Sequence, residues 1–312
     1  MAVLARTALA DFAPAPVPMR TWQHVDRLYV GFLKVFVWSN VWIAAGLASL
    51  TLFTGHVLGL AAEPGPPALV FASGLFIYTL DHVRDAAAGE VADRRLAAYF
   101  LHPVQRFLLV SYGVASLALV ILAPAAVWSV FGAYFLVGLL YGAPVLPVRR
   151  AGGWVKIRIK EIAGLKSWLV GGTMTFAAVG IPLAWAGMLP TPATWRVALF
   201  LFVFCASNAH MFDVRDIESD RATGVSSHPV RLGERHTRMM LVLLNLVMLG
   251  MMMWGWASGV TQVHPEILVA TAATVLYVLL VSSRSPRGVF DVVVDGCFYL
   301  PALLGTIHDV LT

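Results

Sequence analysis

Long apolar stretches separated by short polar segments dominate the pattern along this chain. A helix that crosses a bilayer needs about 20 apolar residues, because each residue adds about 1.5 Å along the axis. The pattern predicts such helices at residues 29–53, 67–84, 106–124, 127–147, 164–186, 194–213, 238–258, 266–283 and 288–309. The shorter alternating segments of an outer-membrane barrel are absent from the sequence. We therefore expect an all-α integral membrane protein with nine transmembrane helices in a single domain over residues 28–312.

The composition supports this class of protein. Hydrophobic residues make up 59% of the chain and charged residues 12%, whereas about 25% of residues in soluble domains are charged. Residues 1–27 have no apolar core long enough for a signal peptide, so we expect a short cytoplasmic extension there. Cys205 and Cys297 both fall inside predicted spans, which argues against a disulfide framework.

Lysine and arginine are concentrated in the N-terminal region and in the connections that follow even-numbered spans. The positive-inside rule then places the N-terminus and these connections in the cytoplasm and the C-terminus outside. We expect a cytoplasmic (inner) membrane of the bacterial type. This topology also accounts for the net charge of +5 and the pI near 9.4 without a nucleic-acid partner.

Two of these connections are also rich in aspartate. Asp81 and Asp85 lie at the end of the second predicted span, and Asp213, Asp216 and Asp220 lie at the end of the sixth. Residues four apart on a helix share one face, where like charges repel, so two such pairs favour a bound cation. Carboxylates without His or Cys at ligand spacing favour Mg²⁺, which proteins hold with carboxylates, waters and substrate phosphates. Solvated surface ion pairs are the simpler alternative for either stretch alone.

The segment DVRDIESDRATGVSSHPVRLG, residues 213–233, resembles the second aspartate-rich motif of the UbiA superfamily of intramembrane prenyltransferases. It has the D-x-x-D-x-x-x-D spacing, then a basic residue, a glycine and a Pro-Val-Arg-Leu-Gly ending. The resemblance covers nearly the whole membrane portion and implies nine helices around a lipid-accessible central cavity. The first motif is looser, because Ile77 stands where the family usually has asparagine, four residues before Asp81.

The resemblance also implies roles for individual residues. All five aspartates would act in catalysis, and Asp81, Asp85, Asp216 and Asp220 would hold the Mg²⁺ that bridges the donor diphosphate. Positively charged and metal groups would then stabilise the departing diphosphate. The remaining substrate-binding candidates are Lys166, Arg215, Lys160, Arg84, Asn208, His210, Tyr78, Tyr141 and Asp295. Packing is the alternative role for His210 and for each aromatic side chain.

We therefore expect a Mg²⁺-dependent prenyltransferase that moves an isoprenyl chain from its diphosphate to a lipophilic acceptor, of the aromatic or quinone type, within membrane lipid. The absence of the usual asparagine leaves open a UbiA-type membrane terpene cyclase, in which the donor's own double bonds capture the carbocation. A transporter of ions or lipids is a further alternative. Transport sites favour the bilayer midplane, however, whereas most acids here lie at the predicted cytoplasmic rim.

Overall fold

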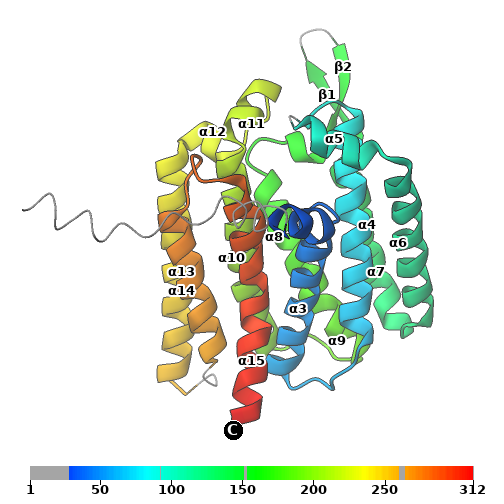
Figure 1. Cartoon of the computed structure of the whole chain (residues 1–312). Coiled ribbons are helices and arrows are strands. Elements are labelled where there is room, and N and C mark those ends of the chain that lie inside the picture. Colours follow the sequence, from blue (N-terminus) through cyan, green and yellow to red (C-terminus); the bar gives the residue numbers. More distant parts are fainter. Residues whose placement is uncertain (1–27, 92, 151–152, 260–263, 312) are drawn as a thin grey trace, which may run out of the picture.

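The computed structural model describes residues 28–91, 93–150, 153–259 and 264–311. The chain forms a bundle of helices that run up and down beside one another, with a two-stranded β-hairpin at one end (Figure 1). The predicted all-α membrane class is confirmed. The expected N-terminal extension, residues 1–27, lies outside the described residues.

Six helices in the described part of the chain are long and apolar enough to cross a membrane. They are α3 (Val41–Leu58), α6 (Pro103–Leu122), α8 with α9 (Lys166–Trp185), α10 (Pro192–Arg215), α13 (Glu234–Ala257) and the segment Val289–His308, which runs into α15 (Leu300–Leu311). Three other predicted spans coincide with α4 (Gly65–Ala87), α7 (Ala125–Tyr141) and α14 (Pro265–Leu280). These three helices differ from the six above. The helix α4 carries charged residues in its last turns, and α7 and α14 are only 17 and 16 residues long. The count of nine crossings therefore stays a prediction.

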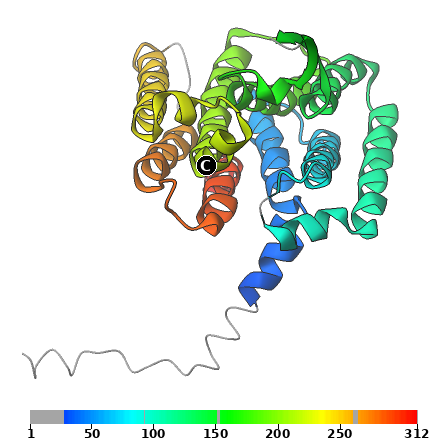
Figure 2. The same cartoon turned by 90° about the horizontal axis from the view of Figure 1, so that it is seen from above.

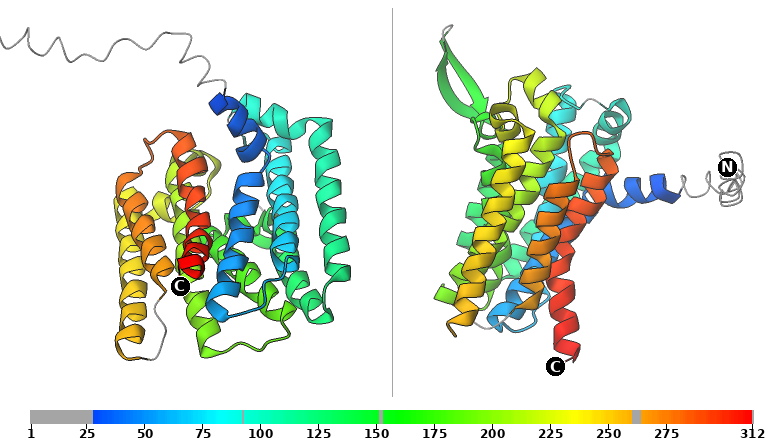
Figure 3. Two further views of the ribbon diagram at one scale, coloured as in Figure 1. Left: turned by 60° about the horizontal axis from the view of Figure 1, so that its bottom comes forward. Right: turned by 90° about the vertical axis from the view of Figure 1, so that its left-hand side faces the viewer.

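The first predicted span, 29–53, is divided in the structure. A helix over Leu28–Val37 ends before Asn40, and α3 begins at Val41. Asn40 has a φ of 64°, in the left-handed region, which turns the chain between the two helices. The first helix consequently points away from the bundle (Figures 2 and 3). Hydropathy alone could not locate this break, because the residues on both sides of it are apolar.

The fourth predicted span, 127–147, was too long at its C-terminal end. The helix α7 ends at Tyr141, and residues 144–158 form an antiparallel hairpin of β1 (Pro144–Arg150) and β2 (Gly153–Arg158). Pro144 and Pro147 explain the change, since a proline inside a helix removes a hydrogen bond and clashes with the preceding turn. The hairpin rises beyond the helix ends (Figure 1).

The helix α10 lies in the interior of the bundle. In the most apolar 18-residue stretch of α10, 78% of the residues are buried, whereas 11% are buried in the corresponding stretch of α6. Gly171 of α8 allows a close approach to it, because a Cβ at this position would lie 2.7 Å from the backbone of Ala206. The rings of Phe200 and Phe204 stack at 5.5 Å in the same core. This packing fixes the position of the polar residues at the C-terminal end of α10.

The two aspartate-rich stretches lie at the same end of the bundle. The C-terminal end of α4, the helix α5 (Arg94–Leu101), the hairpin, α11 (Ile217–Thr223) and α12 (His228–Leu232) gather there (Figure 1). The described C-terminal end of α15 lies at the opposite end (Figure 3). This arrangement agrees with the predicted topology, while the compartment that each end faces stays a prediction.

Candidate active site

Two helices deliver the acidic side chains to this end of the bundle. Asp81 and Asp85 lie on the last turns of α4. Asp213 lies on the last turn of α10, and Asp216 is the residue at which α10 gives way to α11. Asp220 follows on α11, which ends at Gly224 with a φ of 75°. The break at Asp216 keeps the second stretch beside the bundle.

A lysine pairs with each acidic stretch. Lys160, in the short helical turn Ile159–Glu161, places its Nζ 3.2 Å from Oδ1 of Asp81 and 2.5 Å from Oδ1 of Asp85. Lys160 is only 8% exposed. A buried ammonium is stable only when paired, so these contacts hold the chain that follows the hairpin against α4.

Lys166, the first residue of α8, pairs with the second stretch. Its Nζ lies 2.9 Å from Oδ1 of Asp213 and 3.4 Å from Oδ1 of Asp220. The hydroxyl of Ser167 donates a hydrogen bond to the other oxygen of Asp213. Asp213 is 2% exposed, so both of its carboxylate oxygens are used inside the protein.

Arg215 connects the second stretch to the C-terminal segment. Its Nε and Nη2 each lie 2.8 Å from an oxygen of Asp216, and its Nη1 lies 2.7 Å from Oδ1 of Asp291. A bidentate pair of this kind fixes the orientation of the carboxylate as well as its charge. The guanidinium also lies 4.6 Å from the ring centroid of Phe212. Arg215 therefore positions Asp216.

A third basic residue ties the hairpin to α4. Arg158, the last residue of β2, pairs with Glu90 at 2.8 Å and with Glu161 at 2.5 Å, and lies 3.8 Å from Asp85. The hydrogen bond that Arg158 donates to the carboxylate of Glu90 is the main cause that raises the pKa of Arg158. This network anchors the connection that presents Lys160.

A cavity of about 390 Å³ opens between these elements. Nine of the residues selected from the sequence line it: Tyr78, Asp81, Tyr141, Lys166, Asn208, Asp213, Arg215, Asp216 and Asp295. Below Lys166 on the same helix, Val170 and Met174 line the wall, and Ile43 and Trp42 of α3 also contribute. The cavity is therefore polar at the aspartate end and largely apolar deeper in the bundle.

Asp295 lies in the deeper part of the cavity. It is 9% exposed, and Nδ2 of Asn208 lies 3.2 Å from its Oδ1 and 3.1 Å from the backbone oxygen of Val294. Two polar groups selected separately from the sequence thus pair with each other inside the bundle. Asn208 orients a carboxyl group that would otherwise lack a donor at this depth.

The other five selected residues are not among those that line the cavity. Asp85 and Lys160 pair just beside it, and Asp220 lies behind Lys166. Arg84 turns toward α7, where its Nη1 donates to the backbone oxygen of Leu139 at 2.8 Å. His210 is fully buried, with Nδ1 2.7 Å from the backbone oxygen of Ala206 and its ring against Trp168. Its position is that of a packing residue.

Ile77 does not face the cavity. Its side chain packs against α7, where a Cβ on Gly138 would lie 2.6 Å from Cδ1 of Ile77. The cavity instead receives an amide from Asn40, which is 2% exposed and donates to Oγ1 of Thr79 at 3.2 Å. Asn40 was not among the residues selected from the sequence, although a lone asparagine inside an apolar run is a signal of a functional polar group.

The polar residues that line the cavity without having been selected from the sequence include Ser167, Asp291 and Arg287. Ser167 donates to Asp213, and Asp291 accepts from Arg215 and lies 3.8 Å from Arg287. Ser167 is uncharged, so no charge pattern in the sequence indicated its place in the site. The spacing of Asp291 and Asp295, four residues apart, was the signal available for the acidic pair.

The donor set at this end of the bundle fits a hard divalent cation. The side chains that would serve as ligands are carboxylates, which Mg²⁺ prefers. Oδ2 of Asp220 is buried and has no hydrogen-bond partner among the described residues. Burial raises the pKa of Asp220, while Lys166 acts in the opposite direction. A buried oxygen without a donor is the kind of atom that a cation or its bound water satisfies.

The geometry is that of a helical membrane protein with two aspartate-rich stretches at one end of a partly apolar cavity. The family model of the UbiA prenyltransferase family matches residues 101–291. The chain belongs to this family.

Solved structures support the same fold. A UbiA homolog from Archaeoglobus fulgidus bound to GPP and Mg²⁺ superposes with a TM-score of 0.60 at 14% identity, over 85% of this chain and 95% of that one. A UbiA homolog from Aeropyrum pernix K1 gives 0.57 at 15% identity, over 85% and 98%.

A curated relative is similar over a shorter range. Somaliensene A/B synthase of Streptomyces somaliensis is 36% identical over 81 residues, which cover 24% of this chain and 26% of the relative. The alignment thus spans about a quarter of that protein.

Proposed function

We propose that this protein is a Mg²⁺-dependent intramembrane prenyltransferase that moves an isoprenyl chain from an isoprenyl diphosphate to a lipophilic acceptor of the aromatic or quinone type. The cavity carries this proposal, because carboxylates and a lysine line one end and mostly apolar side chains line the rest, with Asn208 and Asp295 as polar exceptions. A diphosphate head with a hydrocarbon tail matches these two ends. The family and the GPP and Mg²⁺ bound in a homolog of the same fold support the assignment.

The residues that would hold Mg²⁺ are Asp81 and Asp85 on α4 and Asp216 and Asp220 beside α10. Bound Mg²⁺ neutralises negative charge on a departing diphosphate. Asp213 has a different role, because its carboxylate oxygens contact Lys166 and Ser167. It holds the lysine at the cavity wall.

Lys166 and Arg215 are the basic residues that interact with the negative charge of the donor diphosphate or with the carboxylates around it. The ammonium of Lys166 lines the cavity and binds diphosphate oxygens as a point charge. Arg215 keeps both oxygens of Asp216 oriented through its bidentate contact. Lys160 neutralises Asp81 and Asp85 from the side of the hairpin. The chain thus supplies cations on both sides of the head group.

The apolar part of the cavity accepts the hydrocarbon and excludes water. Val170 and Met174 line it one and two helical turns below Lys166. When the bond between the allylic carbon and the diphosphate oxygen breaks, the resulting carbocation must be shielded from water. The rings of Tyr78 and Tyr141 line the cavity and can stabilise it by cation–π contact.

Release of diphosphate from geranyl, farnesyl and geranylgeranyl diphosphate tests the proposal. Purified protein in detergent is assayed with and without Mg²⁺, with a membrane lipid extract as the source of acceptor. Asp81→Asn and Asp216→Asn remove one carboxylate each at constant size, and Glu218→Gln removes an exposed carboxylate of the same stretch. We expect Mg²⁺-dependent release that falls at least about 100-fold in both aspartate variants and is unchanged in Glu218→Gln.

Failure to release diphosphate from any donor, in folded protein with acceptor present, would refute the proposal and leave binding or transport as the alternatives. Release that is equally fast without Mg²⁺ would refute the metal dependence. The mass of the lipid product identifies the acceptor, because prenyl transfer adds the isoprenyl group to it and liberates diphosphate.

Cyclisation of the donor is a second candidate function, favoured by one comparison. The relative with 36% identity is a synthase whose product name ends in -ene, the suffix of an unsaturated hydrocarbon. In a cyclase the donor's own double bonds capture the carbocation, a proton is lost, and no acceptor is consumed. A cyclic hydrocarbon formed from the donor in detergent without lipid extract would select this reaction over transfer.

We also propose the membrane setting of the reaction. Both aspartate-rich stretches lie at one end of the bundle together with most of the basic connections. By the positive-inside rule this end faces the cytoplasm of a bacterial-type inner membrane. Accessibility labelling of a cysteine introduced at Glu218, in intact and in lysed cells, tests the orientation.

A further inference from the structure

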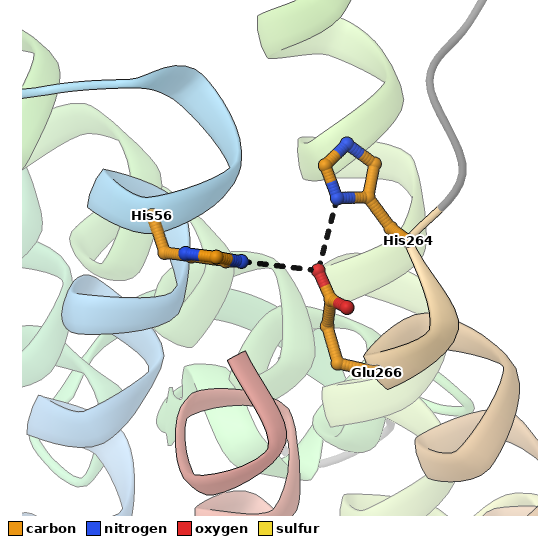
Figure 4. Close-up of side chains that lie close together, drawn as sticks. All are labelled: His56, His264 and Glu266. Carbon is orange, nitrogen blue, oxygen red and sulfur yellow. Dashed lines mark hydrogen bonds and ion pairs between the residues drawn. The ribbon is translucent and has the colours of Figure 1, made fainter. Parts of the chain in front are cut away.

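Two histidines and a glutamate meet at the end of the bundle opposite the candidate active site. His56 lies near the C-terminal end of α3, whereas His264 and Glu266 lie at the N-terminal end of α14. Figure 4 shows the carboxylate of Glu266 between the two imidazole rings, with one oxygen facing both. Helices more than 200 residues apart in the chain thus converge on one carboxylate.

The distances between donor atoms match the size of a metal site. Oε1 of Glu266 lies 3.5 Å from Nε2 of His56 and 2.9 Å from Nδ1 of His264, and the three donor atoms lie within 4.8 Å of one another. Tetrahedral coordination with bonds of about 2.1 Å separates its ligands by about 3.4 Å. Small side-chain rotations are enough to seat an ion between these atoms.

A second observation points to a ligand. Glu266 is 1% exposed, and its Oε2 is buried without a hydrogen-bond partner among the described residues. A buried carboxylate oxygen without a partner is costly. A cation that binds both oxygens of this carboxylate would remove the cost.

The rings are held in position by neighbouring elements. A Cβ on Gly305 of α15 would lie 2.9 Å from Cδ2 of His56, so the helix packs directly on the imidazole. The ring of His308 lies edge-on to His56 with centroids 6.5 Å apart. His56 and His264 nevertheless keep side-chain exposures of 19% and 23%, so that an ion can enter from outside the bundle.

We propose that His56, His264 and Glu266 form a binding site for a divalent transition-metal ion, with Zn²⁺ as the ion that this donor set favours. Two imidazoles and one carboxylate suit Zn²⁺ and are poor ligands for Mg²⁺. The fourth position is left to water. The ion fastens the end of α3 to the start of α14, on the face of the membrane opposite the aspartates.

Zn²⁺ binding by the full-length protein in detergent tests the proposal. The protein is purified without a histidine tag, stripped with a chelator and assayed in excess Mg²⁺, which occupies the aspartate sites. Isothermal titration and elemental analysis of the dialysed protein give affinity and stoichiometry. His56→Ala and His264→Ala each remove one ligand, and His236→Ala is the matched control, an exposed histidine at the other end of the bundle.

We expect one Zn²⁺ per wild-type chain and per His236→Ala chain, and an affinity at least about 10- to 100-fold lower in His56→Ala and His264→Ala. Zn²⁺ should raise the Tm of the wild type and the control but not of the two site variants. An equal loss of affinity in His236→Ala, or no stoichiometric binding by the wild type, would overturn the proposal.

X-ray absorption at the zinc edge of the wild-type protein provides a measurement that does not depend on how the variants fold. We expect scattering from two imidazole rings and an oxygen ligand. A shell of oxygen ligands alone would assign the ion to aspartates and overturn the proposal. The outcome is independent of prenyl-transfer activity.

Discussion

The Nζ atom of Lys166 lies 2.9 Å from Oδ1 of Asp213 at the polar end of the cavity. The ion pair joins the first turn of α8 to the last turn of α10. Because Lys166 also lines the cavity, its ammonium serves two purposes. It balances buried carboxylates, and it presents a positive charge where the head group of the donor would bind.

Replacement of Lys166 by methionine should lower kcat/KM for the isoprenyl diphosphate about 10- to 100-fold. The reason is the loss of one charged hydrogen bond to the diphosphate, which is worth about 1.5–3 kcal/mol. Steady-state rates of diphosphate release measure the effect. Lys156→Met, on the exposed strand β2, is the control and should leave kcat/KM unchanged. Equal effects of the two substitutions would contradict the assigned role.

Arg215→Lys should raise the Mg²⁺ concentration needed for half-maximal activity about tenfold. A lysine keeps the charge but cannot hold both oxygens of Asp216 and reach Asp291 at the same time. Loss of an orienting partner of a metal ligand typically costs 10- to 100-fold in metal affinity. Titration of activity with Mg²⁺ measures the shift, and Arg221→Lys on the exposed side of α11 is the control. A normal Mg²⁺ dependence in Arg215→Lys would exclude the positioning role.

Asn40 should tolerate glycine better than alanine. Both substitutions lose the hydrogen bond to Thr79, but alanine also bears the cost of a left-handed conformation, about 1–2 kcal/mol. The expected order of Tm in detergent is wild type, then Asn40→Gly, then Asn40→Ala. Thermal unfolding followed by tryptophan fluorescence gives the order. An alanine variant as stable as the glycine variant would show that the turn does not require a positive φ.

Gly171→Ala and Gly172→Ala should differ although the residues are neighbours on α8. A Cβ at Gly171 would lie 2.7 Å from the backbone of Ala206, whereas a Cβ at Gly172 meets Phe202 at 3.7 Å. Overpacking at Gly171 should destabilise the fold by about 1–3 kcal/mol. Alanine at Gly172 should be neutral or stabilise by up to about 1 kcal/mol, from helix propensity. Unfolding in denaturant compares the two, and similar stabilities would show that α8 and α10 can separate at little cost.

The parts of this molecule that depend on local pattern were predictable from sequence. The spacing of Asp213, Asp216 and Asp220 identified one acidic stretch, and the apolar runs located most of the helices. The exceptions are α3, which begins at Val41 and not near residue 29, and α7, which ends at Tyr141 and not at residue 147. The pairs of aspartates four residues apart required only the geometry of a helix. Hydropathy also placed both acidic stretches at one end of the bundle.

The remaining features depend on contacts that no local pattern contains. Lys160 pairs with Asp81 from the turn that follows the hairpin. The two prolines in this apolar run indicate that a helix ends there, but they do not identify a hairpin or the partner of Lys160. Ile77 shares a helix with Asp81, yet it packs on Gly138 of α7 and leaves the amide of Asn40 to line the cavity. The partners of these polar side chains could therefore not be predicted from the sequence.

The helix over Leu28–Val37 contributes Leu33 and Val37 to the wall of the cavity, although it points away from the bundle. The room available to a hydrocarbon tail is therefore set partly by a segment outside the tightly packed core. Substitutions in this segment can lengthen or shorten that room without disturbing α8 and α10. For the proposed activity, we expect substrate range and fold stability to depend on different parts of the chain.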